Sequence, residues 1–390
     1  MVSSDSMRTR VTLFAANFFF SLFVTLVAYI PLVYLSSFMP AAYTGLVIAG
    51  GAFCALIFFP FLPRLVARYG AQRLVLLFAS MEMAVLLMLA VTPGVFMVSV
   101  LITLAISLQP LLSYELDLLL EATVVEENMT GRVRALFLTA WNVAALVAPL
   151  LVGALLINAD TYGRIFLVAA AALVPFIALF TVQRLPRGAS PLPSSMRDTF
   201  VRIMRDRDLA AVTFGHLILY LFYVWAPLYV PMYLHNVLGI PWLNLGWMFS
   251  IMLIPYVLIE YPAGWIADRI LGDKELMLAG FLIAGGALAS VSLLTQTSSI
   301  FLILCILISS RIGAALIESM NEGHFFRRVS ERDIDSVSIF RGVWPLADII
   351  APIVGSLILL FGNYQILFAF TGAFVGIAGA VATLLIKDFR

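Results

Sequence analysis

Long apolar runs separated by short polar segments dominate the sequence, and they lack the two-residue alternation of barrel strands. A run of roughly 20 apolar residues, rising about 1.5 Å per residue, forms a helix that crosses about 30 Å of hydrocarbon. Backbone groups in lipid must be satisfied within such a segment, which favours helices. We predict membrane-spanning helices near residues 11–35, 43–63, 73–91, 96–119, 134–157, 163–183, 209–234, 243–265, 275–294, 299–320, 338–361 and 364–386.

The composition strengthens this interpretation. Of the 390 residues, 63% are hydrophobic and 12% are charged, and the mean hydropathy is +1.05. A soluble domain carries about 25% charged residues, so about half of the usual solvated surface is missing. We therefore predict an all-α, polytopic membrane protein. The N-terminal apolar run is too long for a signal-peptide core, and we interpret it as an uncleaved first span.

Several functional classes are disfavoured by the residue pattern. Cys54 and Cys305 lie inside apolar runs without Cys/His spacing, so we expect neither a disulfide framework nor a metal site. The chain lacks a phosphate-binding Gly-Lys-Ser/Thr loop, which argues against ATP-driven pumping. It also lacks a basic nucleic-acid domain. We expect no cofactor.

Basic residues cluster in every second loop, whereas the odd-numbered loops, such as residues 92–94, are short and nearly uncharged. The positive-inside rule then places both termini, the even-numbered loops and a central segment in the cytoplasm of a multi-pass protein of the plasma or inner membrane. The residues on which this depends are Arg64, Arg68, Arg73, Arg132, Arg134, Arg269, Lys274, Arg327, Arg328 and Arg332 in the loops, and Arg184, Arg187, Arg197, Arg202, Arg205 and Arg207 in the central segment.

An internal repeat divides the chain in half. Five short matches keep an offset of 200 to 203 residues. Tyr29-Ile30-Pro31 matches Tyr229-Val230-Pro231, Gly45 matches Gly246, and Arg68 matches Arg269. Asp117 and Glu121 match Glu318 and Glu322, and Trp141 and Ala148-Pro149 match Trp344 and Ala351-Pro352. An even number of spans per copy keeps both copies in one orientation. We predict six-helix bundles at residues 1–183 and 209–390, joined by a cytoplasmic linker at 184–208.

Residues 264–274 carry a recognisable motif, Gly-Trp-Ile-Ala-Asp-Arg followed by Gly-Asp-Lys. It resembles the Gly-x-Leu-Ala-Asp-Arg-x-Gly-Arg-Lys signature of the major facilitator superfamily. The copy in the first half keeps Arg68, Gly70 and Arg73 but has Ala67 in place of the aspartate. The resemblance implies a twelve-span secondary transporter, expected as a monomer, whose halves rock to expose a central site alternately to each side.

Charges at the ends of the spans are candidates for a cytoplasmic gate. Opposite charges at one depth on neighbouring helices can pair and separate as the halves rock. The alternative is a set of static ion pairs that anchor the helix ends. The candidate gate residues are Arg68, Arg73, Asp117, Glu121, Gly264, Asp268, Arg269, Glu318 and Glu322.

Ionisable residues at bilayer depth are functional candidates, since each costs at least about 2.5–3.5 kcal/mol there. Arg311 and Asp348 lie at similar predicted depths, so the two can pair. Arg311 could bind an anionic group and Asp348 could carry a proton, or the two could form a permanent structural pair. Glu82, alone on the third span, could couple to protons or merely face another helix.

The resemblance implies that the first, fourth, fifth and seventh spans line the cavity. Four polar residues lie on these spans: Asn17, Gln109, Asn142 and His216. They could contact a solute or hold helices together. The span-seven aromatics, including Tyr220, Phe222 and Tyr223, could line an aromatic cavity or serve as packing residues. Pro149 and Gly153 retain part of the span-five pattern of the family's drug and metabolite antiporters.

Together these features predict proton-coupled export of a small organic or amphiphilic solute. The alternative transport mode is proton-coupled uptake of a small anion that binds Arg311. A membrane enzyme, a scramblase or a non-transporting sensor could use the same scaffold. An enzyme is disfavoured because the only acidic cluster, at residues 115–127, recurs at 318–322 beside basic loops.

Overall fold

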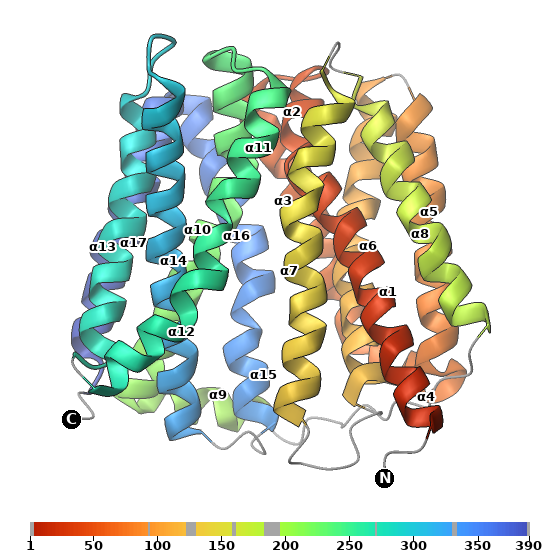
Figure 1. Ribbon diagram of the computed structural model, residues 1–390, viewed down its shortest axis with the longest axis horizontal. Helices are drawn as coiled ribbons and strands as arrows, with labels where there is room; N and C mark the ends of the chain where they lie inside the picture. Colours follow the sequence, from red (N-terminus) through yellow and green to blue (C-terminus); the bar gives the residue numbers. More distant parts are fainter. Residues whose placement is uncertain are drawn as a thin grey trace. The chain divides into compact units, whose positions relative to one another are not determined.

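The computed structural model describes residues 4–92, 94–121, 130–157, 161–182, 196–269, 271–329 and 334–387. These residues form helices and short connections, without a strand among them (Figure 1). The first half contains α1 Ser4–Ala28, α2 Pro31–Ser36, α3 Ala41–Phe58, α4 Leu62–Tyr69, α5 Ala71–Val91, α6 Val95–Glu121, α7 Thr130–Leu155 and α8 Gly163–Val182. The second contains α9 Met196–Arg205, α10 Arg207–Met232, α11 Trp242–Met252, α12 Ile254–Arg269, α13 Asp273–Ser290, α14 Ile300–Arg328, α15 Ile334–Arg341, α16 Val343–Phe361 and α17 Tyr364–Leu385.

The predicted polytopic all-α fold is confirmed. Within the described parts of the chain, ten helical segments are long and apolar enough to cross a membrane. A shorter apolar stretch, Thr139–Leu155, accounts for the predicted fifth span, and α11 with α12 covers the eighth. The tenth span differs from its prediction, because α14 continues to Arg328 rather than ending near residue 320.

Several of the described spans are interrupted, which the apolar pattern did not predict; in the second, a 3₁₀ segment at Phe59–Phe61 separates α3 from α4. Breaks occur between α1 and α2 before Pro31, between α11 and α12 at Leu253, and between α15 and α16 at Gly342. Proline lacks the backbone N–H that a helix interior needs, so a helix restarts with proline in its first turn. This accounts for Pro31 at the start of α2 and Pro255 at the start of α12.

The chain forms two compact units. The N-terminal unit comprises residues 1–40, 47–192 and 241–250, and the C-terminal unit comprises residues 41–46, 193–240 and 251–390. Thus α3 starts in the C-terminal unit and continues in the N-terminal unit, whereas α11 starts in the N-terminal unit. In the N-terminal unit, α1 packs against α7 and α8, and α5 packs against α6 and α8. Its core includes an aromatic group formed by Phe20, Phe176 and Phe180.

Close helix contacts in the C-terminal unit depend on glycines, because lipid provides little hydrophobic driving force between helices and packing must supply it. The helix α13 packs against both α14 and α17. Gly285 faces α17, where an added Cβ would meet the backbone of Gly376 and lie 2.6 Å from the Gly372 carbonyl oxygen. Gly286, the next residue, has no atom within 4 Å of such a Cβ.

We expect Gly285→Ala to lower the free energy of unfolding by about 1–3 kcal/mol, the usual cost of overpacking. Gly286→Ala is the matched control and should be neutral or slightly stabilising, since alanine favours helices by up to about 1 kcal/mol. Thermal unfolding of the purified protein in detergent measures both. Equal melting temperatures for the two variants would contradict the close α13–α17 contact.

Candidate functional site

A partly buried polar network joins three helices of the C-terminal unit. Tyr223 of α10 donates its hydroxyl to Oε2 of Glu318 on α14, at 2.5 Å. The Tyr256 hydroxyl of α12 interacts with both Tyr223 and the guanidinium of Arg311 on α14. Arg311 is only 5% exposed, and its guanidinium lies 5.4 Å from the centre of the Phe222 ring. The network therefore holds a cation and a carboxylate within the unit, each beside a tyrosine.

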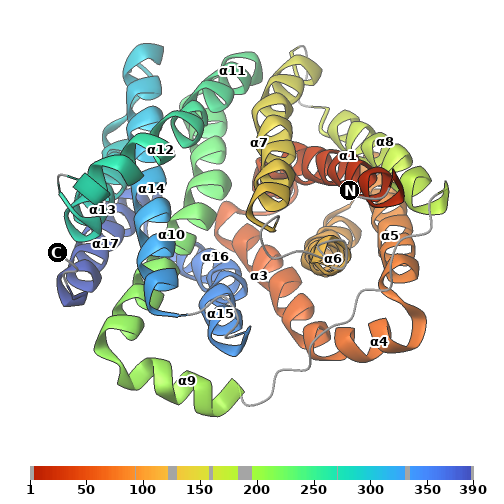
Figure 2. The same ribbon diagram turned by 60° about the horizontal axis from the view of Figure 1, so that its bottom comes forward.

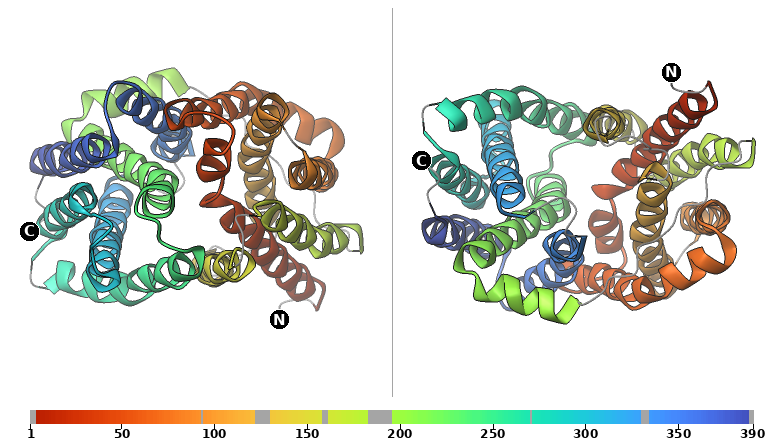
Figure 3. Two further views of the ribbon diagram at one scale, coloured as in Figure 1. Left: turned by 90° about the horizontal axis from the view of Figure 1, so that it is seen from above. Right: turned by 90° about the horizontal axis from the view of Figure 1, so that it is seen from below.

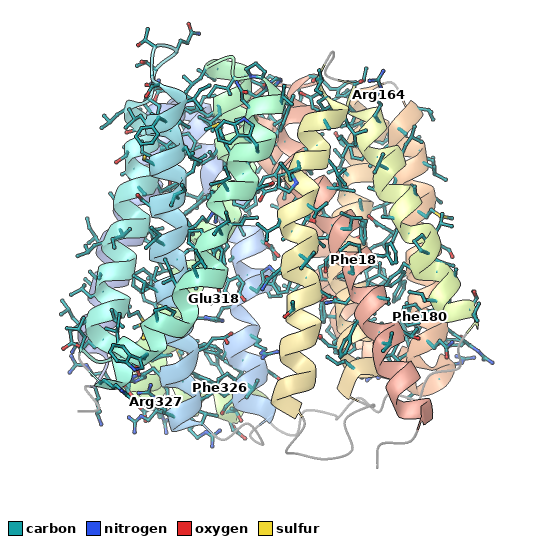
Figure 4. The ribbon with its side chains drawn as sticks, viewed as in Figure 1. Phe18, Arg164, Phe180, Glu318, Phe326 and Arg327 are labelled. Carbon is teal, nitrogen blue, oxygen red and sulfur yellow. The ribbon has the colours of Figure 1, made fainter. Side chains whose placement is uncertain are left out.

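Local structure explains how these side chains meet. Arg311 and Glu318 are seven residues apart on α14, two turns along one helical face. Tyr256 follows the break at Leu253, in the first turn of α12. Because α14 extends to Arg328, Glu318 lies ten residues, or about 15 Å, inside the helix. Figure 4 shows Glu318 above Phe326 and Arg327, away from the helix end.

An aromatic stack borders the network. The His216 ring stacks on Phe340 with centroids 3.8 Å apart, and Phe340 stacks on Phe325 at 4.0 Å. His216 Nδ1 also lies 3.1 Å from Nδ2 of Asn321. The predicted site residue His216 is therefore buried in packing and hydrogen-bonded to α14, one turn before Tyr220.

Three acidic residues of the C-terminal unit lie near Tyr220. Its side chain lies within electrostatic reach of Glu318, Glu322 and Asp348, and of one cation, Arg341. Its ring stacks on Trp344 at 6.0 Å. The structure thus brings together Glu318 and Glu322, which are candidate gate residues, and Asp348, which is a candidate for the proton pathway.

The pair that similar depth would allow between Arg311 and Asp348 does not form. Arg311 interacts with Tyr256 and Phe222 instead, and Asp348 of α16 makes no ion pair with any described residue. Equal depth along two helices does not fix the direction in which each side chain points. Arg311 therefore lies with Tyr223 and Tyr256, whereas Asp348 lies near Tyr220.

The N-terminal unit contains isolated buried acids. Both carboxyl oxygens of Glu82 on α5 and of Glu115 on α6 are buried without a hydrogen-bond partner among the described residues. Glu82 lies in the middle of the stripe with which α5 packs into its unit. Sequence reasoning did not single out Glu115. Of the other candidates, Asn17 is buried, Gln109 is half-buried and Asn142 is exposed.

The polar network exists in only one copy of the repeat. At the repeat offsets of 200 and 201 residues, Tyr223, Tyr256 and Arg311 correspond to Phe23, Ala55 and Pro110. Only the acidic residue is kept: Asp117 in the first copy corresponds to Glu318 in the second. Asp117 is exposed, whereas Glu318 is half-buried, so even this shared position differs in environment.

Two of the candidate gate arginines contact aromatic rings. Arg68 lies over the ring of Tyr69, and Arg269 lies over the ring of Trp265, at 5.2 and 5.3 Å from the ring centres. Neither Arg68, Arg73 nor Arg269 pairs with an acid among the residues whose side chains are described. The side chains of Glu121 and Asp268 lie outside the described part of the structure, and Gly264 is half-buried on α12.

An ionic cluster that sequence reasoning missed lies where α10, α13, α14 and the C-terminal segment meet. Asp208 is fully buried and accepts hydrogen bonds from Nε of Arg328 and from the backbone N–H of Lys387, both at 2.7 Å. His324 Nε2 lies 3.3 Å from Asp208, and its Nδ1 lies 3.6 Å from Asp273. Its members come from distant segments, so no local pattern could reveal it.

Repeat-related glycines make equivalent contacts in the two units. In the C-terminal unit, a Cβ added to Gly45 of α3 would lie 2.6 Å from the Pro352 carbonyl oxygen. In the N-terminal unit, a Cβ added to Gly246 of α11 would lie 2.6 Å from the Pro149 carbonyl oxygen. Gly153 borders the second contact, with its added Cβ 2.9 Å from the Trp242 carbonyl oxygen. The candidate span-five residues Pro149 and Gly153 therefore allow close packing of α7 against α11.

Comparison with known proteins assigns this architecture to a family. The family model described as Major Facilitator Superfamily matches residues 11–321 and also residues 214–388. Among solved structures, a peptide transporter, POT, in complex with alafosfalin has the same fold, with a TM-score of 0.75 and 14% sequence identity over 97% of this chain and 95% of that chain. No curated protein matches the sequence significantly. The chain belongs to the Major Facilitator Superfamily and has the fold of a secondary membrane transporter.

Proposed function

We propose that the protein couples the movement of a small organic solute to that of protons, using the network of Tyr223, Tyr256, Arg311 and Glu318. The observation that carries this proposal is the 2.5 Å hydrogen bond between Tyr223 and Glu318 beside the buried Arg311. An ionised carboxylate within a membrane-spanning helix costs about 2.5–3.5 kcal/mol unless it is paired or hydrogen-bonded. Loading or releasing a proton at Glu318 would therefore change the energy of the whole network.

A coupling role also requires that the acid communicate with the solute site. Glu318 and Arg311 share one face of α14, and both contact tyrosines that interact with each other. A solute group that engages Arg311 or Tyr256 would alter the hydrogen bonding of Tyr223 and hence of Glu318. Glu322 and Asp348, which share Tyr220 with Glu318, provide a route for the proton.

The direction of transport has two candidate answers. Export is supported by the resemblance of Pro149 and Gly153 to the antiporter pattern of span five. Uptake of an anionic solute is supported by Arg311, because the guanidinium presents a planar donor fork suited to carboxylate or phosphate groups. We favour export and retain uptake of a small anion as the second candidate.

The membrane orientation is part of the proposal. We place both termini on the cytoplasmic side of the cell membrane, with the protein acting as a monomer. Support comes from the basic residues near α9 and at the C-terminal end of α14, including Arg205, Arg207 and Arg328. Basic segments of membrane proteins remain preferentially in the cytoplasm.

The proposed coupling can be tested in liposomes that contain the purified protein and a trapped pH-sensitive dye. Adding solutes from a panel to the outside should change the internal pH only for transported compounds. Inward solute movement with acidification indicates symport, and alkalinisation indicates antiport. Solute movement without any pH change would overturn proton coupling and leave the family assignment intact.

Glu318→Gln should reduce solute-driven proton flux by roughly tenfold or more, since a positioned proton-transferring group contributes about 10²–10⁴-fold in favourable cases. Glu82→Gln, a buried acid of the other unit, is the comparison variant and should retain the flux. Loss of flux in Glu82→Gln with retention in Glu318→Gln would move the coupling site to the N-terminal unit.

A further inference from the structure

The helix α9 lies across the lower end of the C-terminal unit instead of standing parallel to its spans (Figure 2). Viewed along the spans, α9 lies at the edge of that unit (Figure 3). One side anchors the helix: Thr199 and Ile203 are 8% and 0% exposed, and α9 contacts α10 and α15. Arg202 also donates a hydrogen bond of 2.7 Å to Ser336 of α15.

The exposed sides of α9 combine apolar and basic side chains. Phe200 and Met204, one turn apart, are 52% and 43% exposed. At 100° per residue, Arg197, Val201 and Arg205 follow as the next row around the helix, and all three are exposed. Beside this row lies a hollow of about 340 Å³ that is lined by Asp198, Val201, Arg202 and Arg205.

This combination matches an interfacial membrane helix. Such helices lie in the plane of the membrane surface, with aromatic and aliphatic residues directed toward the acyl chains and arginines near the phosphates. Basic residues near the cytoplasmic leaflet are attracted to its anionic lipids by about 1 kcal/mol each. The hollow is lined by the guanidinium groups of Arg202 and Arg205, the apolar Val201 and one carboxylate, Asp198, so its basic groups outnumber its acidic one.

We propose that the exposed face of α9 binds anionic phospholipid headgroups of the cytoplasmic leaflet. Phe200 and Met204 insert among the lipids, while Arg197 and Arg205 pair with phosphates. This anchors the start of the C-terminal unit at the membrane surface, because α10 follows α9 after a single residue, Asp206. The proposal rests on the proposed orientation but requires neither proton coupling nor a particular solute.

Hydrogen exchange of the α9 backbone tests this proposal on the full-length protein in vesicles. Exchange should be slower in vesicles of phosphatidylcholine with phosphatidylglycerol than in phosphatidylcholine alone. The double variant Arg197→Gln/Arg205→Gln should lose most of this difference, because two arginines together account for roughly 30-fold in lipid association. The variant Arg197→Lys/Arg205→Lys keeps both charges and should keep the difference, which a purely structural role of the arginines would not predict.

Arg164→Gln removes an exposed arginine from the start of α8 and is the matched control, expected to behave as the wild type. Inorganic phosphate is added to the phosphatidylcholine vesicles to separate a lipid from a soluble anion. Slower exchange on adding phosphate alone would overturn the lipid proposal in favour of a free anion. Equal exchange in the two kinds of vesicle, or an unchanged difference in the double glutamine variant, would also overturn it.

Discussion

Replacing Arg311 by glutamine is expected to reduce solute-driven proton flux by about 100-fold or more. The guanidinium is almost fully buried between Phe222 and Tyr256, and Tyr256 connects it to the Tyr223–Glu318 hydrogen bond. Truncating one partner of a buried, hydrogen-bonded charge pair costs about 2–5 kcal/mol of binding free energy, and each 1.4 kcal/mol corresponds to a factor of ten. Liposomes with a trapped pH indicator measure the flux directly.

Two further variants show whether the charge or the shape of Arg311 matters. Arg311→Lys keeps the charge but loses the planar donor fork, so we expect partial flux and a raised apparent KM for anionic solutes. Arg164→Gln, at the exposed start of α8, should leave the flux unchanged. Wild-type flux in a stable Arg311→Gln protein would exclude the network as the solute site.

Asp208→Asn should lower the free energy of unfolding by about 3 kcal/mol, because it removes the buried carboxylate that Arg328 and His324 face. The neutral amide also cannot accept the Lys387 N–H bond and the Arg328 bond as strongly as a charged acceptor does. Chemical or thermal unfolding in detergent measures this loss, and limited proteolysis near residue 387 reports whether the C-terminal segment detaches.

Asp206→Asn is a close control for this prediction. Asp206 caps α10 by accepting from the backbone N–H groups of Asp208 and Leu209, at 2.9 and 3.3 Å. Asparagine caps helices about as well as aspartate, so the change should cost less than about 0.5 kcal/mol. If both variants unfold alike, the Asp208 cluster does not contribute the stability that its burial implies.

The apolar runs were sufficient to predict the fold class and the approximate limits of the spans, because lipid requires long, internally bonded helices. The predicted end of the tenth span, near residue 320, was wrong. Residues 321–328 include Glu322, His324, Arg327 and Arg328, and an apolar run excludes such charged residues. In the structure these residues continue the helix, and His324 and both arginines contact buried acids. Charged residues can extend a span when their partners lie on neighbouring helices.

The candidate site was only partly accessible from the sequence. Burial cost in lipid identified Arg311 and Asp348 as important residues, but helical depth alone cannot show which neighbour each side chain faces. Tyr223 was one of several span-seven aromatics that could line a cavity or serve as packing, and Tyr256 was not singled out, since a hydroxyl leaves no trace in an apolar pattern. The Tyr223–Glu318 contact joins residues 95 positions apart, which only tertiary structure can bring together.

The duplicated halves have not kept duplicated chemistry. Where the second half has Tyr223, Tyr256 and Arg311, the first has Phe23, Ala55 and Pro110, although the glycine–proline contacts persist in both. A transporter whose two halves had both kept this network would have two equivalent ligand sites. Because the proposed network is present in one half only, the proposal implies one solute-binding site of this chemistry per chain instead of two.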